Sequence, residues 1–510
     1  MGKISKRQFL AAAGAATAAT SFGLGSALAR AATKRDFDLI VVGGGNAGLP
    51  TAVFAAERGA TVAIVEAAGI VGGTLHLSSG QMSAAGTRLQ REHGIEDTPQ
   101  SHYDDVMRIS KNTANPQILR LATNAAAPAF DWLLERGFKP IDGHPITGTT
   151  HEPYSRPRYV WAREGGRAIL RVLNEQLVPH IAAGRVTVLT GHSAVELVQS
   201  RSGAISGLVV TDPDGKRQVL RGRRVALTSG GYTANPAMFL KYEGTRTHTR
   251  ATYPFSQGIG LELGLAAGGF IRGGENHTPL FGAILADDQS PTSMRAMARH
   301  FPPERQPWEI LVDARGKRFL REDIPSHDAY EQALAALPDE RCWFIYDQAI
   351  SKAAPPLIRG GFSGPWTPAD SERAFAEREH GFHRADDLGA VARSAGIDPQ
   401  GLIDTVADYN RGRERNADAF GRQHMPLPIG SGPFHAVEIT SWNLLSYAGV
   451  AVDAGLRVIR SDGSPIPNLF AAGELLGMGT VMGKGMPGGM SVMPALSLGR
   501  LLGKELIDFA

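Results

Sequence analysis

The sequence contains a single cysteine, Cys342, in 510 residues. One cysteine excludes an intrachain disulfide and a cysteine-ligated iron–sulfur cluster. A C-x-x-C-H string, at which haem would be attached, is also missing. Excess charge of one sign is missing too, because 53 basic residues nearly balance 50 acidic residues. The composition therefore lacks the excess positive charge that would indicate binding to nucleic acid or an anionic membrane, and we expect no nucleic-acid partner.

The N-terminal apolar run lacks the Leu, Ile, Val and Phe content of a membrane anchor. This run, Phe9 to Ala29, is rich in Ala, Gly and Thr, follows a basic start and ends in small-x-small cleavage sites. The string SKRQFL resembles a twin-arginine signal with Lys6 in place of the first arginine. We predict that residues 1–31 are a signal for export to the periplasm or otherwise out of the cytoplasm, without a stable membrane anchor. The alternative is a retained amphipathic tail.

Residues 36–66 have the pattern of a dinucleotide-binding βαβ unit. An apolar strand over Leu39–Val42 leads into a glycine turn, a small-residue helix and a second strand that ends at Glu66. The turn matches G-x-G-x-x-G, in which side chains would block the turn, the pyrophosphate or the helix–strand contact. Glu66 is placed to accept hydrogen bonds from a ribose hydroxyl, and the helix N-terminus favours the diphosphate. A purely structural glycine-rich turn is the alternative.

A second segment, Val71–Thr87, is dense in Gly, Ser, Thr and Ala. Small residues let the backbone approach a flat ligand closely, and polar side chains there offer hydrogen-bond donors to it. The donors that we single out are Thr74, Ser78, Ser79 and Gln81. A flexible surface loop is the alternative interpretation.

Four separated stretches carry a resemblance to a known family. They are VVGGGNAGL with Glu66, GGTLHLSSGQMSAAG, GKRFLREDIPSHD from Gly316, and GLRVIRSDGSPIPNLFAAGELLG leading to GGMSVMPALSLGR. With these stretches the chain resembles the flavoprotein family that includes soluble fumarate reductases, the flavoprotein subunit of succinate dehydrogenase and the 3-ketosteroid Δ1-dehydrogenases. The resemblance implies FAD as the cofactor.

The resemblance also implies an architecture. We expect an α/β fold in which a Rossmann-like FAD-binding domain, with a parallel sheet, is built from two segments of the chain. These segments are residues 36–275 and 446–510. An inserted α+β cap, which would hold the substrate, covers residues 276–445 and is richer in Pro, charge and aromatic residues.

The resemblance implies where the chain contacts FAD. Glu474 would lie against the ribityl chain, and the helix that starts at Ser491 would direct its N-terminal amides at the flavin. His76 raises the question of a histidyl bond to flavin, but it stands two residues past the matching position, so we predict non-covalent FAD. We predict no metal site. The predicted FAD contacts are Gly43, Gly45, Asn46, Ala47, Gly48, Glu66, Thr74, Ser79, Gly80, Gln81, Ser229, Gly230, Gln257, Gly258, Glu474, Gly489, Ser491 and Val492.

In this family a hydride passes between flavin N5 and one carbon of a C–C bond, while a protein group handles the proton on the next carbon. Soluble fumarate reductases have an arginine as proton donor where this chain has Ser326 and His327. They grip a substrate carboxylate with a second arginine, where this chain has Met486. A histidine expected before the final segment is missing, and Tyr447 is the nearest ionisable side chain. Because a dianion would be poorly paired here, these losses argue against a C4-dicarboxylate reductase.

Four residues are candidates for catalysis: His327, His277, Tyr447 and Ser326. His327 is the first choice for proton transfer, because histidine titrates near neutral pH; a helix-start or surface histidine is the alternative. His277 is a candidate substrate ligand or else a satisfied structural histidine. Tyr447 is a candidate donor to a substrate carbonyl or else a core residue.

Aromatic residues alternate with arginines between His151 and Arg167. Arg158 could bind a substrate anion, and Tyr159 could provide a stacking surface. Solvated arginines are the alternative.

We therefore predict an exported FAD-dependent oxidoreductase that reduces or introduces an activated C=C bond in a small molecule other than fumarate. With no haem or cluster of its own, the chain needs a separate electron donor or acceptor, such as a cytochrome or a quinone-linked protein. Two alternatives stay open. One is a flavin amine or alcohol oxidase that uses oxygen, and the other is a non-catalytic flavin electron-carrier subunit.

Overall fold

A computed structural model describes residues 36–148, 151–249, 252–361 and 364–509. The predicted export signal, residues 1–31, lies outside these residues. Within the described part of the chain, no helix is both long and apolar enough to cross a membrane.

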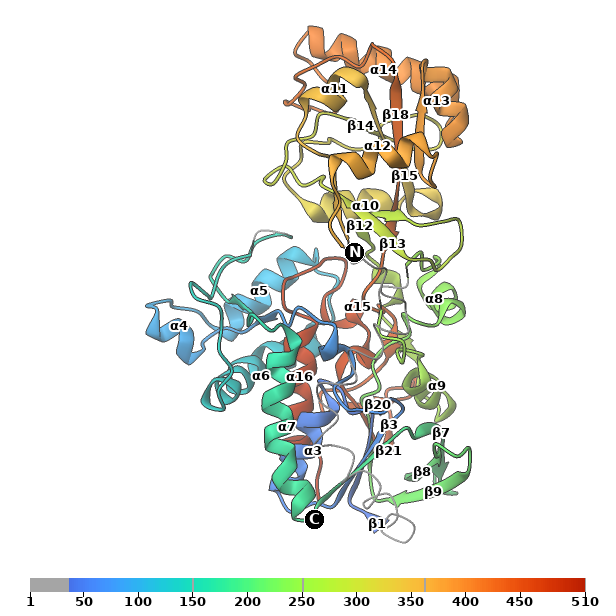
Figure 1. Ribbon diagram of the computed structural model, residues 1–510. Helices are drawn as coiled ribbons and strands as arrows, with labels where there is room; N and C mark the ends of the chain where they lie inside the picture. The colour runs from blue at the N-terminus through green and yellow to red at the C-terminus, as the bar shows by residue number, and fades with distance from the viewer. Residues whose placement is uncertain (1–35, 149–150, 250–251, 362–363, 510) are drawn as a thin grey trace, which may run out of the picture.

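The lower part of the molecule is built on a six-stranded sheet (Figure 1). Four of its five strand pairings are parallel, and the pairing of the edge strand β20 with β21 is antiparallel. In spatial order its strands are β20 (Arg457–Ile459), β21 (Pro465–Ala471), β10 (Val225–Leu227), β2 (Leu39–Val42), β3 (Val62–Glu66) and β6 (Val186–Thr190). The predicted α/β fold, with a parallel sheet drawn from both segments of the chain, is confirmed.

Layers of other elements cover this sheet. Every residue of β2 and β3 is buried, as expected for strands of a parallel sheet with both faces covered. Three neighbouring helices lie along one side of the sheet: α3 (Gly48–Glu57), α7 (Gly166–Ala182) and α16 (Val492–Leu501). A second sheet consists of β1 (Asp36–Phe37), β9 (Arg217–Gly222), β8 (Ile205–Thr211) and β7 (Ser193–Gln199).

Short elements connect this part of the molecule and border the site. Strand β4 (Met82–Ser83) pairs with β5 (Tyr159–Val160). The connecting helices are η2 (Gly73–His76), α4 (Arg88–Glu92), α5 (Pro99–Ile109), α6 (Pro116–Glu135), α8 (Pro236–Glu243), α9 (Ile259–Ala266), η3 (Gly274–Asn276), η5 (Gly473–Leu476), α15 (Met478–Val481) and η6 (Leu502–Leu506). Strand β11 (Ile271–Arg272) pairs with β19 (Gly449–Val450).

The upper part of the molecule is an antiparallel sheet with helices around it (Figure 1). Its strands are β14 (Ile310–Val312), β15 (Arg341–Asp347), β18 (Phe434–Trp442), β12 (Leu280–Leu285), β13 (Met294–Ala298) and β16 (Ile358–Gly360), with β17 (Phe382–Ala385) also paired to β18. Its helices are α10 (His327–Ala335), η4 (Pro338–Glu340), α11 (Gln348–Ala353), α12 (Pro368–Ala376), α13 (Leu388–Ala395) and α14 (Pro399–Glu414).

The two parts have separate large hydrophobic cores. The buried members of one core lie between Phe37 and Ala267 and between Ala448 and Ile507. Those of the other lie between Phe281 and Ile439. The boundaries predicted at 275–276 and 445–446 fall between these groups, and the division into an FAD-binding domain and a cap stays a prediction.

Candidate functional site

The glycine turn after β2 combines tight packing with open space. Gly43 has φ +98°, and a Cβ at Gly48 would lie 1.9 Å from the Gly43 carbonyl oxygen, so this contact requires glycine. A Cβ at Gly45, in contrast, would meet nothing closer than the Gly73 Cα at 4.0 Å, and a Cβ at Gly230 would meet nothing within 4 Å. Gly45 and Gly230 therefore leave room for a ligand to approach the backbone.

Polar atoms border this open space. The Glu66 carboxylate, at the end of β3, accepts hydrogen bonds from Gly44 N at 2.9 Å and Ala68 N at 2.8 Å. Asn46 donates from Nδ2 to the Val492 carbonyl at 2.7 Å, while its Oδ1 is buried without a partner among the described residues. The Ser229 hydroxyl is likewise buried without a partner in the described part. These groups fit the hydroxyl and phosphate groups of a dinucleotide such as FAD.

The last segment of the chain closes the same region. Glu474, in η5, accepts hydrogen bonds from Ser446 N at 3.0 Å and Ser446 Oγ at 2.8 Å, and burial raises its pKa above the usual range. Gly489 has φ +80°, and a Cβ there would lie 2.3 Å from the Met82 carbonyl carbon. Ser491 precedes the first turn of α16, so the helix N-terminus follows this close contact directly.

The remaining predicted contacts take different positions. Thr74 and Ser79 are exposed, whereas Gln257 closes its own loop by donating from Nε2 to Pro254 O at 2.7 Å and Ala234 O at 3.3 Å. His76 Nε2 hydrogen bonds with the Val71 carbonyl at 3.0 Å. Ala47 is buried and Gln81 partly buried, and Gly80 and Gly258 are buried with positive φ. Non-covalent attachment and these individual contacts stay predictions.

His277 lies between two buried carboxylates. Its Nδ1 is 2.9 Å from Glu243 Oε2, and its Nε2 is 3.2 Å from Glu340 Oε1. Burial opposes the charged form, but the two carboxylates outweigh it and raise the pKa of His277 to about 9. Because both ring nitrogens are engaged, this environment favours the structural alternative over a substrate ligand.

Stability should depend on pH through this histidine. A pKa raised from 6.5 to about 9 adds stability that is complete below about pH 6.5 and is lost as pH rises through about 9. The expected loss in the free energy of unfolding is up to about 3 kcal/mol. Urea unfolding between pH 6 and 10 measures it, and His277→Gln should flatten this part of the profile. The prediction would be contradicted if the free energy of unfolding fell equally steeply with pH in the wild type and in His277→Gln.

Tyr447 and Ser326 have different surroundings: the buried Tyr447 hydroxyl has no hydrogen-bond partner among the described residues, whereas the Ser326 hydroxyl caps a helix. Tyr447 is fully buried with its ring 5.4 Å from that of His277, and burial raises the pKa of its hydroxyl well above the usual value. Ser326 is the N-cap of α10: its hydroxyl accepts from Ala329 N at 3.2 Å and donates to Glu152 Oε1 at 2.6 Å.

His327 is the first residue of α10. Its ring stacks on Phe301 at 4.0 Å and lies 5.0 Å from the His300 ring. Burial and the neighbouring histidines lower the pKa of His327 to about 2, so it is neutral at physiological pH. No hydrogen bond or ion pair holds this ring within the described residues. The residue that the sequence favoured for proton transfer is therefore poorly suited to carry a proton at physiological pH.

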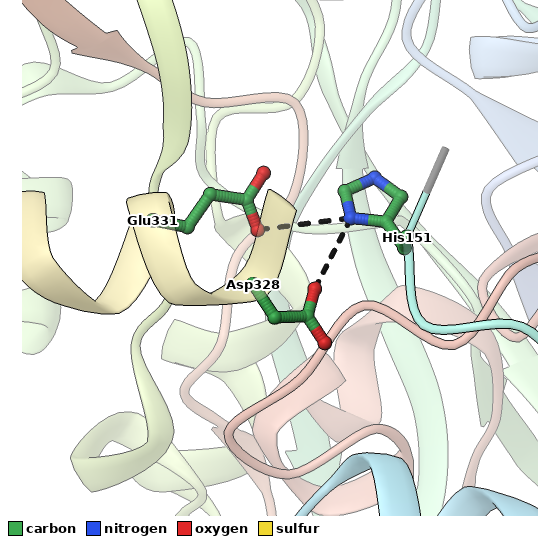
Figure 2. A group of neighbouring side chains, drawn as sticks. All are labelled: His151, Asp328 and Glu331. Carbon is green, nitrogen blue, oxygen red and sulfur yellow. Dashed lines mark hydrogen bonds and ion pairs between the residues drawn. The ribbon is translucent and has the colours of Figure 1, made fainter. Parts of the chain in front are cut away.

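A neighbouring group was not found from the sequence. His151 Nδ1 lies 3.2 Å from Asp328 Oδ1 and 3.8 Å from Glu331 Oε2, as Figure 2 shows. The two acids are buried and lie three residues apart on α10, whereas His151 comes from the loop before β5. One nitrogen or oxygen atom from each of the three side chains lies within 4.8 Å of the others, a spacing that a metal ion could also use, whereas the sequence predicted no metal site.

Arg158 is paired with two acids in the interior. Its guanidinium is fully buried, 2.8 Å from Asp97 and 2.7 Å from Asp105, which agrees neither with the suggestion that it could bind a substrate anion nor with the alternative of a solvated arginine. Tyr159 packs against Gly488, since a Cβ there would lie 2.9 Å from its ring. The Tyr154 hydroxyl also donates to the Gly488 carbonyl. The segment of His151 is thus fixed to the loop before α16.

The chain is similar to several proteins of known activity. It is 29% identical over 487 residues to an NADH:fumarate oxidoreductase of Klebsiella pneumoniae, covering 93% of this chain and 48% of that protein. The chain thus spans about half the length of that relative. It is 27% identical to a vinyl phenol reductase of Lactiplantibacillus plantarum, covering 89% of this chain and 92% of the relative. A urocanate reductase of Eggerthella lenta is 25% identical, with 93% and 75% covered.

Solved structures show the same fold. The open conformation of a flavocytochrome c3 fumarate reductase has a TM-score of 0.66 at 23% identity, covering 94% of this chain and 80% of that one. A 3-ketosteroid Δ1-dehydrogenase of Sterolibacterium denitrificans has a TM-score of 0.70 at 18% identity, covering 93% and 99%. A family model described as "FAD binding domain" matches residues 38–489. The resemblance seen in the sequence is confirmed: the chain belongs to the FAD binding domain family, and its cofactor is FAD.

Proposed function

We propose that the protein is an FAD-dependent oxidoreductase that reduces or introduces a C=C bond next to a carbonyl or carboxylate, in a small molecule other than fumarate. The observation that carries the proposal is the junction of α10 with the segment that contains His151. Support comes from the contact of α10 with the loop that leads into α16, the helix expected to face the flavin: Gln332 of α10 donates to the Lys484 carbonyl at 3.3 Å. The similarity to reductases of vinyl phenol, urocanate and fumarate supports the proposal.

The residues around the glycine turn would hold FAD. Gly45 and Gly230 admit the cofactor to the backbone, and Asn46, Glu66 and Ser229 offer polar atoms to it. When bound, FAD exchanges a hydride with one carbon of the substrate bond. The chain's own task is to hold the substrate and to move a proton at the adjacent carbon.

The surroundings favour a substrate with less charge than a dicarboxylate. Met486, which stands where soluble fumarate reductases have a carboxylate-gripping arginine, is partly buried and packs on the large core of the lower domain. Arg158, which the sequence offered as a residue that could bind a substrate anion, is instead paired with Asp97 and Asp105. A ring ketone, or a mono-acid of the same size as such a ketone, needs fewer cations than a dicarboxylate and so fits these surroundings.

Export and the redox partner belong to the same proposal. Residues 1–31 would direct the protein to the periplasm or otherwise out of the cytoplasm. A separate cytochrome or quinone-linked protein would supply or remove electrons, because the single cysteine excludes a cysteine-ligated cluster in this chain.

Substrate-driven reoxidation of the flavin tests the proposal. The FAD-loaded protein is reduced with dithionite under anaerobic conditions and mixed with enones and unsaturated acids while flavin absorbance is followed. We expect rapid reoxidation by an enone or unsaturated mono-acid, and little or none by fumarate. A second panel mixes oxidised protein with saturated partners, where bleaching would indicate the dehydrogenase direction. If flavin absorbance changes in neither panel, the proposal is contradicted. Peroxide formation with amines or alcohols would favour an oxidase.

A further inference from the structure

We infer that His151 is the proton-transfer residue of the candidate site, and that Asp328 and Glu331 are the positioning residues that orient its ring. This inference rests on the proposed function and adds a residue to which neither the sequence nor the comparisons assigned a role. It replaces His327, the residue that the sequence favoured.

The hydrogen-bond geometry of His151 is that of an oriented acid or base. Nδ1 is hydrogen-bonded to Asp328 Oδ1 at 3.2 Å and lies at ion-pair distance, 3.8 Å, from Glu331 Oε2. Figure 2 shows the second ring nitrogen on the side away from the two acids. Within the described residues Nε2 makes no hydrogen bond. A carboxylate at one nitrogen fixes the tautomer and orientation of the ring and stabilises the imidazolium, which leaves the other nitrogen to exchange a proton.

The position of His151 joins the cap to the expected flavin end of the lower domain. Asp328 and Glu331 are on α10 of the cap, whereas His151 is three residues before Tyr154, which is anchored to the Gly488 carbonyl. The side chain of His151 is 19% exposed, so solvent can restore its proton. Both acids are nearly inaccessible, at 6% and 2% of their side-chain surface.

His327 lacks these features. The rings of His151 and His327 are 5.4 Å apart, but His327 stacks on Phe301 and has no carboxylate against it in the described part of the chain. The charged or titratable groups that face His151 are Asp328, Glu331, Glu152, His327 and His300. Although burial opposes the charge, the three acids raise the pKa of His151, whereas the pKa of His327 falls to about 2. Burial also raises the pKa of Glu331 to about 8, so Asp328 is the firmer of the two carboxylate partners at neutral pH. The surroundings therefore favour the charged form of His151 and disfavour that of His327.

The reductive reaction is balanced as follows. The substrate gains a hydride at one carbon and the Nε2 proton of His151 at the next, so that two C–H bonds replace the π bond. The two electrons arrive with the hydride. His151 becomes neutral and regains a proton from solvent, while its carboxylate partners remain in place. In the oxidative direction neutral His151 accepts the proton.

The first test compares His151→Gln with His327→Gln in the FAD-loaded protein, using a compound that reoxidises the reduced wild type. We expect His151→Gln to slow reoxidation about 100-fold or more, as is typical of a lost general acid, and His327→Gln to have the smaller effect. His383→Gln, a half-buried histidine bonded to Ser394 in the cap, is the matched control. Full activity of His151→Gln, or a larger loss in His327→Gln, overturns the inference. A wild type that no compound reoxidises counts against the proposed function instead.

The second test needs no substrate. Histidine labelled with ¹⁵N is titrated in the oxidised, FAD-loaded protein, and the His151 signal is assigned by its loss in His151→Gln. Its midpoint should lie above 6.5 and should fall in Asp328→Asn and Glu331→Gln, with recovery in Asp328→Glu. A ring that is neutral at pH 6 overturns the inference. So does one bound metal ion per chain that disappears in His151→Gln, because Nδ1 would then be a metal ligand.

Discussion

Replacing Arg158 by methionine is expected to lower the free energy of unfolding by about 3–5 kcal/mol. The guanidinium bonds to both oxygens of Asp97, each at 2.8 Å, and to Asp105 Oδ2 at 2.7 Å. The side chains of Arg158 and Asp97 are 0% exposed, and that of Asp105 is 5% exposed. Methionine fills a similar volume but leaves Asp97 without its cation and Asp105 with only the half-exposed Arg108, which is the costly outcome.

Denaturant unfolding of the wild type and Arg158→Met measures this loss. The control is Arg171→Met, which removes an exposed i,i+4 pair with Glu175 and an exposed hydrogen bond to the Gly137 carbonyl, and should cost about 1 kcal/mol or less. A sharper version adds Asp97→Asn and Asp105→Asn to Arg158→Met. Because the unpaired charges are then gone, part of the lost stability should return. A loss in Arg158→Met no larger than that of the control would show that the buried pairs contribute little.

Gly45→Val is expected to produce a folded protein that does not retain FAD. Gly45 does not have a positive φ, and its Cβ would point into open space, so the apoprotein can accept a side chain. The same space is where the pyrophosphate must approach the backbone. We expect a loss of about 4 kcal/mol in FAD binding, roughly 1000-fold in affinity, from steric conflict and lost hydrogen bonds.

Visible flavin absorbance per protein after gel filtration measures retention of FAD, and far-ultraviolet circular dichroism measures the fold. Gly69→Ala is the control, because Gly69 also has open space around its Cβ position but lies outside the predicted FAD contacts. Retention of FAD by Gly45→Val at the wild-type level would mean that the pyrophosphate lies elsewhere.

The fold was predictable because its signals are local. The strand Leu39–Val42, the glycine turn and the strand that ends at Glu66 are contiguous, and each residue type there has a steric reason. The two-segment sheet was predictable only through resemblance, since no local pattern states that β10 pairs with β21. The structure confirms both the βαβ unit and the sheet that is built from two segments of the chain.

The candidate site was less predictable because its chemistry depends on distant residues. His327 stands in the expected loop, but Phe301 and His300 determine its protonation, and no pattern in the loop reveals them. His151 and Asp328 are separated by 177 positions. The i,i+3 spacing of Asp328 and Glu331 was a visible signal, although acid pairs on helices are usually solvated. Arg158 was misread because an arginine among aromatics looks the same whether it is exposed or buried.

The pairing of β10 with both β2 and β21 has a consequence for biosynthesis. Asn46 is bonded to Val492, which is 446 positions later in the chain, so residues from both segments border the open space at the glycine turn. A nascent chain cannot assemble this border before Val492 has been synthesised. We therefore expect stable flavin capture only after that point, however early the first βαβ unit forms.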